Sequence, residues 1–157
     1  MTTRLRSALL IGIAGVLAAV IVWAVYSLLT HQEREVAMPR DDASPQQVVT
    51  AFIDAVNAHD CETASGLEAK GADIAKGWCK DVAELSDVKM RTPYREEPDG
   101  SGHDANQQVM NVGVTFSLNW RLLRSDGSMP EGLTTWGYRL ERASDDAPWR
   151  ISDQGAG

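Results

Sequence analysis

The chain has 157 residues, which is enough for one domain of ordinary size and a short additional segment. It carries 15 Lys and Arg residues against 22 Asp and Glu residues, a net charge of −7 at pH 7. This acidic balance excludes the basic proteins that bind nucleic acid through its phosphates, and it disfavours a broad contact with anionic lipid headgroups.

An uncharged apolar run, ALLIGIAGVLAAVIVWAVYSLL, occupies residues 8–29. As a helix, rising about 1.5 Å per residue, it would cross a hydrocarbon core of about 30 Å. A cleaved signal peptide has a shorter apolar region, of about 7–15 residues, that ends at a small-x-small site. The segment between Trp23 and Gln32 has no such site. We therefore expect one uncleaved transmembrane helix that acts as a signal anchor.

Two basic residues, Arg4 and Arg6, precede this run and predict its orientation. Positive flanks stay in the cytoplasm, so residues 1–7 are expected inside and the remainder outside a cell membrane that the chain crosses once. Without Arg4 and Arg6, 13 basic residues face 22 acidic ones, and the exported part carries a net charge of −9. Residues 30–43 are polar and aperiodic, and we interpret them as a linker to an extracytoplasmic domain over residues 44–157.

The domain is predicted to begin with an amphipathic helix. Ser44, Pro45 and Gln47 match an N-cap, a first helical position and a capping box. Apolar residues then recur at helical spacing: Val48, Val49, Phe52, Ile53 and Val56. The helix is expected to end before Asp60, which can cap a second helix over residues 61–67, and residues 68–87 read as irregular or weakly helical.

From Val88 onward the period of the apolar residues changes to two. Between residues 110 and 120 every even position is apolar and every odd position is polar or glycine, which predicts a half-buried strand. Residues 133–142 repeat the pattern, and further strands are expected at residues 87–94 and from Trp149. The sequence therefore predicts an α+β fold in which helices pack on a curved antiparallel sheet.

This order of elements, with PQQVVTAFIDAVNAHDCETA at residues 45–64 and PWRISDQG at residues 148–155, resembles the nuclear transport factor 2-like superfamily. The resemblance covers residues 44–155, and the superfamily includes SnoaL-like and ketosteroid-isomerase-like domains. A long first helix in that superfamily often ends in an N-x-x-D turn, which Asn57 and Asp60 match. The resemblance implies a cone-shaped domain. The whole chain is also similar to small exported proteins of high-GC Gram-positive bacteria.

His59, Asp60 and Cys61 stand side by side and raise the question of a catalytic cluster. Cys79 is the one other cysteine, and an even pair in an exported domain is expected to form a disulfide. A reactive thiolate at Cys61 would instead have to stay reduced outside the cell. Roles at helix ends explain His59 and Asp60, so we predict no catalytic residue, and no metal-ligand spacing or cofactor motif is found.

Three functions remain as hypotheses. The first is a non-enzymatic accessory or assembly subunit of an envelope complex, acting through a protein partner or self-association, as its resemblance to mycobacterial import-associated membrane proteins and type IV secretion assembly factors implies. The second is a binding module for a small apolar ligand, with an aromatic-lined cavity. Its candidate lining residues are Phe52, Val56, Phe116, Trp120, Trp136 and Tyr138. The third is an isomerase-like or hydrolase-like enzyme that uses Asp54, His59, Tyr138 or Asp153.

Overall fold

The computed structural model describes residues 16–17, 19–23, 34–96, 107–124 and 129–156. The chain divides into two compact units, Met1–Glu33 and Arg34–Gly157. The expected transmembrane helix, residues 8–29, lies mostly outside the described residues, and no helix within the described ranges is long and apolar enough to cross a membrane.

Three helices form one layer of the second unit: α2 (Pro45–Ala58), α3 (Cys61–Gly66) and α4 (Ala75–Asp81). The expected capping box is confirmed, because Ser44 Oγ accepts from the Gln47 N–H and Gln47 Oε1 accepts from the Ser44 N–H. Asp60 caps α3 by accepting from the Thr63 N–H at 3.0 Å. Helix α4 lies where the sequence indicated only weak helical character. Trp78 and Cys79 are buried on its inner side.

The sheet contains β1 (Val82–Met90), β2 (Tyr94–Arg95), β3 (Gln108–Trp120), β4 (Gly132–Arg142) and β5 (Arg150–Ala156). Its strand order is β1-β3-β4-β5 with antiparallel neighbours, and β2 pairs with β3. The α+β class with an antiparallel sheet is thus confirmed. The first strand begins at Val82 rather than at residue 87, because it follows α4 directly and passes Asp87 at a bulge with a positive φ.

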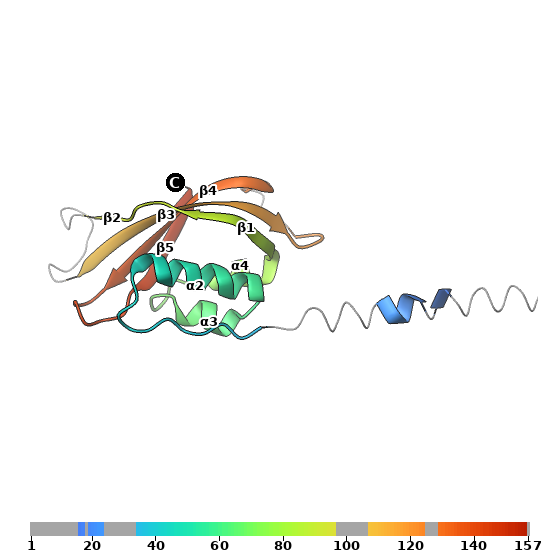
Figure 1. Cartoon of the computed structure of the whole chain (residues 1–157), viewed down its shortest axis with the longest axis horizontal. Helices are drawn as coiled ribbons and strands as arrows, with labels where there is room; N and C mark the ends of the chain where they lie inside the picture. The colour runs from blue at the N-terminus through green and yellow to red at the C-terminus, as the bar shows by residue number, and fades with distance from the viewer. Residues whose placement is uncertain (1–15, 18, 24–33, 97–106, 125–128, 157) are drawn as a thin grey trace, which may run out of the picture. The chain divides into compact units, whose positions relative to one another are not determined.

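The helices cover one face of the sheet, and no helix of the described part of this unit covers the other face (Figure 1). The alternation predicted for β3 is confirmed, since Val112, Val114, Phe116 and Leu118 are all buried toward the helices. They meet the apolar face of α2, which buries its valines, Phe52 and Ile53. One core between the two layers therefore holds the domain together.

Part of the segment expected to be a linker is docked on this unit. Arg34 N–H donates to the Ala58 carbonyl at 3.3 Å, and Val36 N–H donates to Asp60 Oδ2 at 2.8 Å. The Val36 carbonyl accepts from Thr63 Oγ1 at 3.2 Å, and the Val36 side chain packs against the core. Only residues 30–33 therefore separate the apolar run from the compact unit.

The two cysteines form the expected disulfide. Cys61 at the start of α3 and Cys79 in α4 are bonded, with 5.6 Å between their Cα atoms. The bridge joins the two short helices, and His59 caps the end of α2 in a left-handed conformation with φ 57°. The HDC cluster is therefore a helix end, a helix cap and half of a disulfide.

Candidate functional site

The outer face of the sheet carries a groove whose floor is made of glycine. Gly113 of β3 pairs with Gly137 of β4, which pairs with Gly155 of β5, so three glycines lie in register across three strands. Because glycine has no side chain, no side chain of the row itself covers the backbone, and the space above Gly137 and Gly155 is open. The resulting groove has a volume of about 490 Å³.

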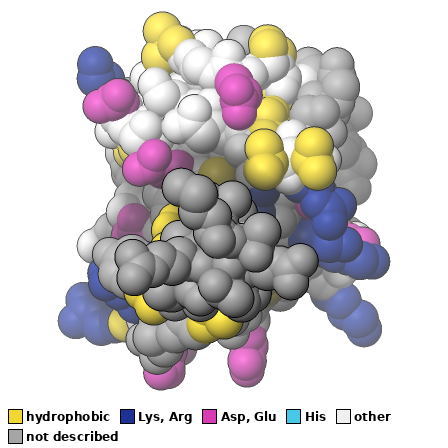
Figure 2. Space-filling view, turned by 90° about the vertical axis from the view of Figure 1, so that its right-hand side faces the viewer, with side chains coloured by type: hydrophobic (Ala, Val, Ile, Leu, Met, Phe, Trp, Pro, Cys, Tyr) yellow, Lys and Arg dark blue, Asp and Glu magenta, His cyan; other side chains and the backbone are white. Residues whose placement is uncertain are grey.

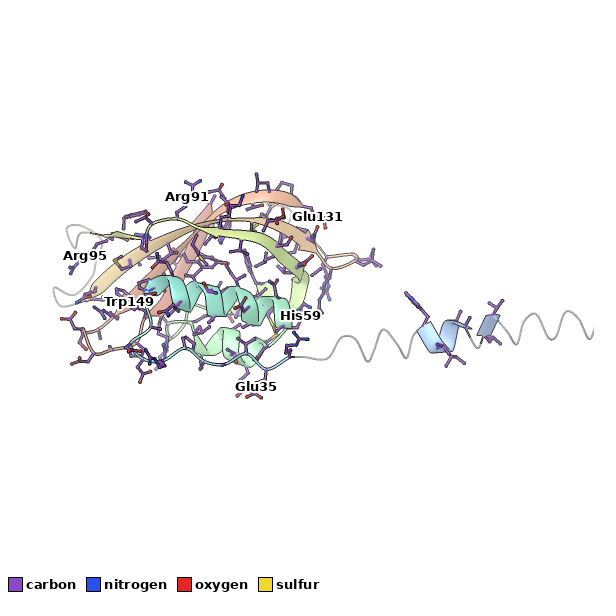
Figure 3. The ribbon with its side chains drawn as sticks, in the orientation of Figure 1. Glu35, His59, Arg91, Arg95, Glu131 and Trp149 are labelled. Atoms are coloured by element: carbon purple, nitrogen blue, oxygen red, sulfur yellow. A yellow bond between two sulfur atoms is a disulfide. The ribbon has the colours of Figure 1, made fainter. Side chains whose placement is uncertain are left out.

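Side chains from neighbouring rows form the walls of the groove. Arg91, on the segment after β1, donates its N–H to the Gly113 carbonyl at 2.8 Å. Its side chain lies across that glycine, where an added Cβ would meet Arg91 Cδ at 3.2 Å. Figure 3 shows Arg91 on the side of the sheet that faces away from the helices. Thr135 and the exposed ring of Tyr94 also line the groove.

A cluster of hydrogen-bonded polar side chains forms the groove wall next to the glycine row. Arg139 Nε lies 3.0 Å from Glu96 Oε2, and Asn111 Nδ2 donates to the same oxygen at 3.2 Å. Asp153 pairs with Arg139 across β4 and β5 and is exposed. The groove therefore presents an aromatic ring and charges of both signs, which suits contact with a polar and partly apolar partner surface.

The predicted cavity residues lie in the layer between the helices and the sheet. Phe52, Phe116 and Tyr138 are fully buried, and the Phe52 and Tyr138 rings contact edge to face with centroids 5.6 Å apart. Trp78 lies among them, and its ring centroid is 5.9 Å from that of Phe116 and 5.7 Å from that of Trp136. These rings thus fill space against one another.

The other two predicted lining residues differ in exposure. Val56 is fully buried, whereas Trp120 is half-buried and donates its indole N–H to the Met129 carbonyl at 3.0 Å. Trp136 is half-buried, donates to Gln154 Oε1 at 3.1 Å and also contributes to the outer groove.

The residues considered for acid or base chemistry lie in different layers. Asp54 is exposed on α2, His59 lies at the end of that helix, and Asp153 lies at the groove on the opposite face of the sheet. The Tyr138 hydroxyl is buried in the core and has no hydrogen-bond partner among the described residues. Burial raises the Tyr138 pKa above its ordinary value, so its hydroxyl stays protonated and is unsuited to act as a base.

Within the described ranges, no group of three or more His, Cys, Asp or Glu side chains is placed to hold a metal ion.

Sequence reasoning missed the groove, because its parts are far apart in the chain. The alternation in β3 identified Gly113 as an outward position, and the similar pattern in β4 does the same for Gly137. Only the strand register, however, shows that the two residues and Gly155 are neighbours. Arg91 and Tyr94 carried no periodic signal, since they flank the short strand β2.

Comparison with known proteins gave one matching structure. No family model and no curated protein matches the chain. The matching solution structure is RPA3114, a SEC-C motif containing protein from Rhodopseudomonas palustris, with 14% identity over 75% of this chain and 82% of that chain and a TM-score of 0.47. That protein contains a SEC-C motif, and no family model of the nuclear transport factor 2-like superfamily matches the chain, so the expected membership of that superfamily, SnoaL-like domains included, is not supported and is not retained. The motifs that suggested it are short and apolar, and they reflect a capped amphipathic helix and a half-buried strand, which other α+β folds also contain.

Proposed function

We propose that this chain is a single-pass membrane protein whose extracytoplasmic domain binds another protein through the groove on the outer face of its sheet. The role is non-enzymatic, that of an accessory or assembly subunit of an envelope complex. Residues 8–29 are the anchor, with the N-terminus in the cytoplasm. The groove with its glycine floor is the observation that carries the proposal.

The composition of the groove supports a protein partner. Arg and Tyr are enriched at the centres of protein interfaces, and here Arg91 and Tyr94 stand at the groove with exposed side chains. Gly137 and Gly155 let a partner side chain approach the backbone of β4 and β5, beside the Arg91 side chain that covers Gly113. We infer that the partner presents a carboxylate to Arg91 and an apolar side chain to the Tyr94 ring.

The disulfide agrees with an extracytoplasmic position, because such bonds persist in oxidising compartments. The packing of the interior aromatic rings favours the outer face over the interior as the site of contact. Self-association through the same groove is the alternative form of this proposal.

Photo-crosslinking in cells tests the groove directly. A benzophenone amino acid at Thr135, in the groove, should give protein adducts that mass spectrometry identifies. The same amino acid at Thr50, exposed on α2, should not give those adducts. Recovery of the monomer alone at Thr135, across growth conditions, would overturn the proposal.

A matched pair of glycine variants separates binding from folding. Gly137→Val fills the groove floor, and an added Cβ there has only an ordinary contact, 3.7 Å from the Gly155 carbonyl oxygen. The fold should therefore accept valine, which also favours strands, while the adducts at Thr135 disappear. Gly77→Ala, in α4, where an added Cβ meets no atom within 4 Å, should leave the adducts unchanged. Persistence of the adducts in Gly137→Val would show that the groove is not the contact.

A further inference from the structure

The segment that follows β3 exposes two adjacent leucines. Leu122 is 90% exposed and Leu123 is 97% exposed, and they stand between Arg121 and Arg124. Single exposed leucines are ordinary on protein surfaces, but a contiguous apolar patch marks an interaction site. Leu133, at the start of the next strand, is 82% exposed at the same end of the β3–β4 pair.

The backbone holds this RLLR tip, residues 121–124, in a defined turn. Arg124 N–H donates to the Arg121 carbonyl at 2.8 Å, and Arg121 N–H donates to the Asp81 carbonyl at 2.9 Å. Leu123 adopts φ 64°, a left-handed conformation that is unfavourable for a branched side chain. The structure therefore keeps Leu123 in solvent at a cost in backbone energy, which is typical of functional positions.

The tip lies at the end of the domain at which the chain arrives from its N-terminal segment. Arg34, the first residue of the compact unit, is hydrogen-bonded to Ala58 at the end of α2. The neighbouring His59 ring contacts the Cys79 carbonyl at 3.3 Å, two residues before the Asp81 carbonyl that holds Arg121. Figure 3 shows His59 and Glu131 at this end, with Arg95 and Trp149 at the other. Figure 2, seen from that side, shows hydrophobic side chains close to a group of Lys and Arg side chains.

Chain length limits how far this end can lie from the anchor. Residues 30–33 alone lie between the apolar run and Arg34. At most about 3.6 Å per residue, the five steps from residue 29 to residue 34 reach no more than about 18 Å. A membrane anchor over residues 8–29 would therefore keep this end of the domain close to the lipid headgroups.

We propose that the RLLR tip is a second membrane contact, with Leu122 and Leu123 below the lipid phosphates and Arg121 and Arg124 at phosphate level. This inference rests on the proposed anchor. Leucines gain free energy by entering the interfacial layer, and guanidinium groups bind phosphate oxygens in a bidentate manner. The net negative charge of the exported part repels anionic headgroups elsewhere, so the tip would orient the domain and leave the outer groove turned toward partners.

The local charges allow this contact. Arg124 Nε lies 3.5 Å from Asp81 Oδ1, yet its side chain is half exposed, and among the described residues its other guanidinium nitrogens have no ion pair. One carboxylate oxygen of Glu131, Oε1, accepts a hydrogen bond from the backbone N–H of Trp120 at 3.0 Å. Exposed Lys80 adds a further positive charge beside Asp81.

Depth-dependent quenching on the full chain tests the proposal. The variant Leu123→Cys would be labelled with bimane in vesicles of phosphatidylcholine and phosphatidylglycerol, with the native disulfide left oxidised. Lys70→Cys is the matched control, because Lys70 is exposed in the loop beside the Ile151 end of β5, at the opposite end of the sheet. Spin-labelled lipid should quench the label at position 123 and not at 70, while iodide quenching at 123 should be lower by about tenfold or more. In the variant that also carries Arg121→Glu and Arg124→Glu, spin-labelled lipid should no longer quench the label at position 123, and iodide should quench it.

Three other results would overturn the contact. Equal iodide quenching at positions 123 and 70 would place the tip in water, and protection from both quenchers would place it against protein. Lipid quenching at 123 that the two glutamate substitutions leave unchanged would refute the role of the arginines. Carbonate extraction of the membranes tests the anchor separately. If the chain stays in the membrane but iodide still quenches the label at position 123, the tip contact alone is refuted. If carbonate extracts the chain, the anchor is refuted.

Discussion

Replacing Asn57 with alanine removes a pair of hydrogen bonds that joins α2 to strand β1. The Asn57 side chain donates from Nδ2 to the Leu85 carbonyl at 2.9 Å and accepts from the Leu85 N–H at Oδ1 at 2.7 Å. Leu85 is buried in the edge strand, so its backbone groups have little access to water after the substitution. Each lost bond is worth about 1 kcal/mol, and each unpaired buried group costs about 1–3 kcal/mol. We expect Asn57→Ala to lower the free energy of unfolding by about 2–4 kcal/mol.

Urea unfolding followed by tryptophan fluorescence measures this loss. Asn119→Ala is the matched control, because Asn119 is exposed on β3, and it should change stability by less than about 0.5 kcal/mol. Asn57→Asp keeps the acceptor but loses the donor at neutral pH, so it should be destabilised at pH 7 and partly recover below about pH 4, where the carboxyl is protonated. A loss below about 1 kcal/mol in Asn57→Ala would show that water replaces both bonds and would refute the reasoning.

Two further predictions concern the turn between α2 and α3. Replacing Cys61 and Cys79 with alanine opens a loop with a sequence separation of 18, which should lower stability by about 3 kcal/mol and Tm by about 10 °C in a calorimetric scan. Unchanged melting, or alkylation of the native protein without reductant, would contradict the structural role of the bond. Hydrogen bonds from the backbone N–H groups of Thr63 and Val36 hold the pKa of Asp60 below its ordinary value. A lowered pKa in the folded state stabilises the protein above the unfolded pKa, and this stability is lost as pH falls below about 4. Asp60→Asn should remove that part of the pH dependence in urea midpoints measured between pH 7 and pH 3, and a profile identical to that of the parent would refute it.

The elements with strong local signals were predictable from the sequence. Ser44 and Gln47 gave the start of α2 because a capping box depends on residues three apart. The alternation around Phe116 gave β3 because period two has no helical counterpart. The disulfide followed from there being only two cysteines.

The features that depend on long-range partners were not predictable. Asp60 was expected to cap α3, but its second role, accepting from Val36, joins residues 24 apart in sequence. Asn57 was assigned to a family turn, whereas it holds Leu85, a partner 28 residues away. The groove depends on strand register, which the apolar pattern fixes only once the pairing is known.

The docked segment, residues 34–43, shortens the stretch of chain between the proposed anchor and the folded domain. Its hydrogen bonds to the helical layer are made at Arg34 and Val36, while Glu35, Ala37 and Met38 are exposed. Releasing these ten residues would lengthen the connection formed by residues 30–33 by up to about 36 Å. If residues 8–29 are the membrane anchor proposed above, release of the docked segment would let the domain move further from the bilayer than its docked state allows. Because Val36 is bonded to Asp60 and Thr63, loss of those two contacts would be the step that frees this length of chain.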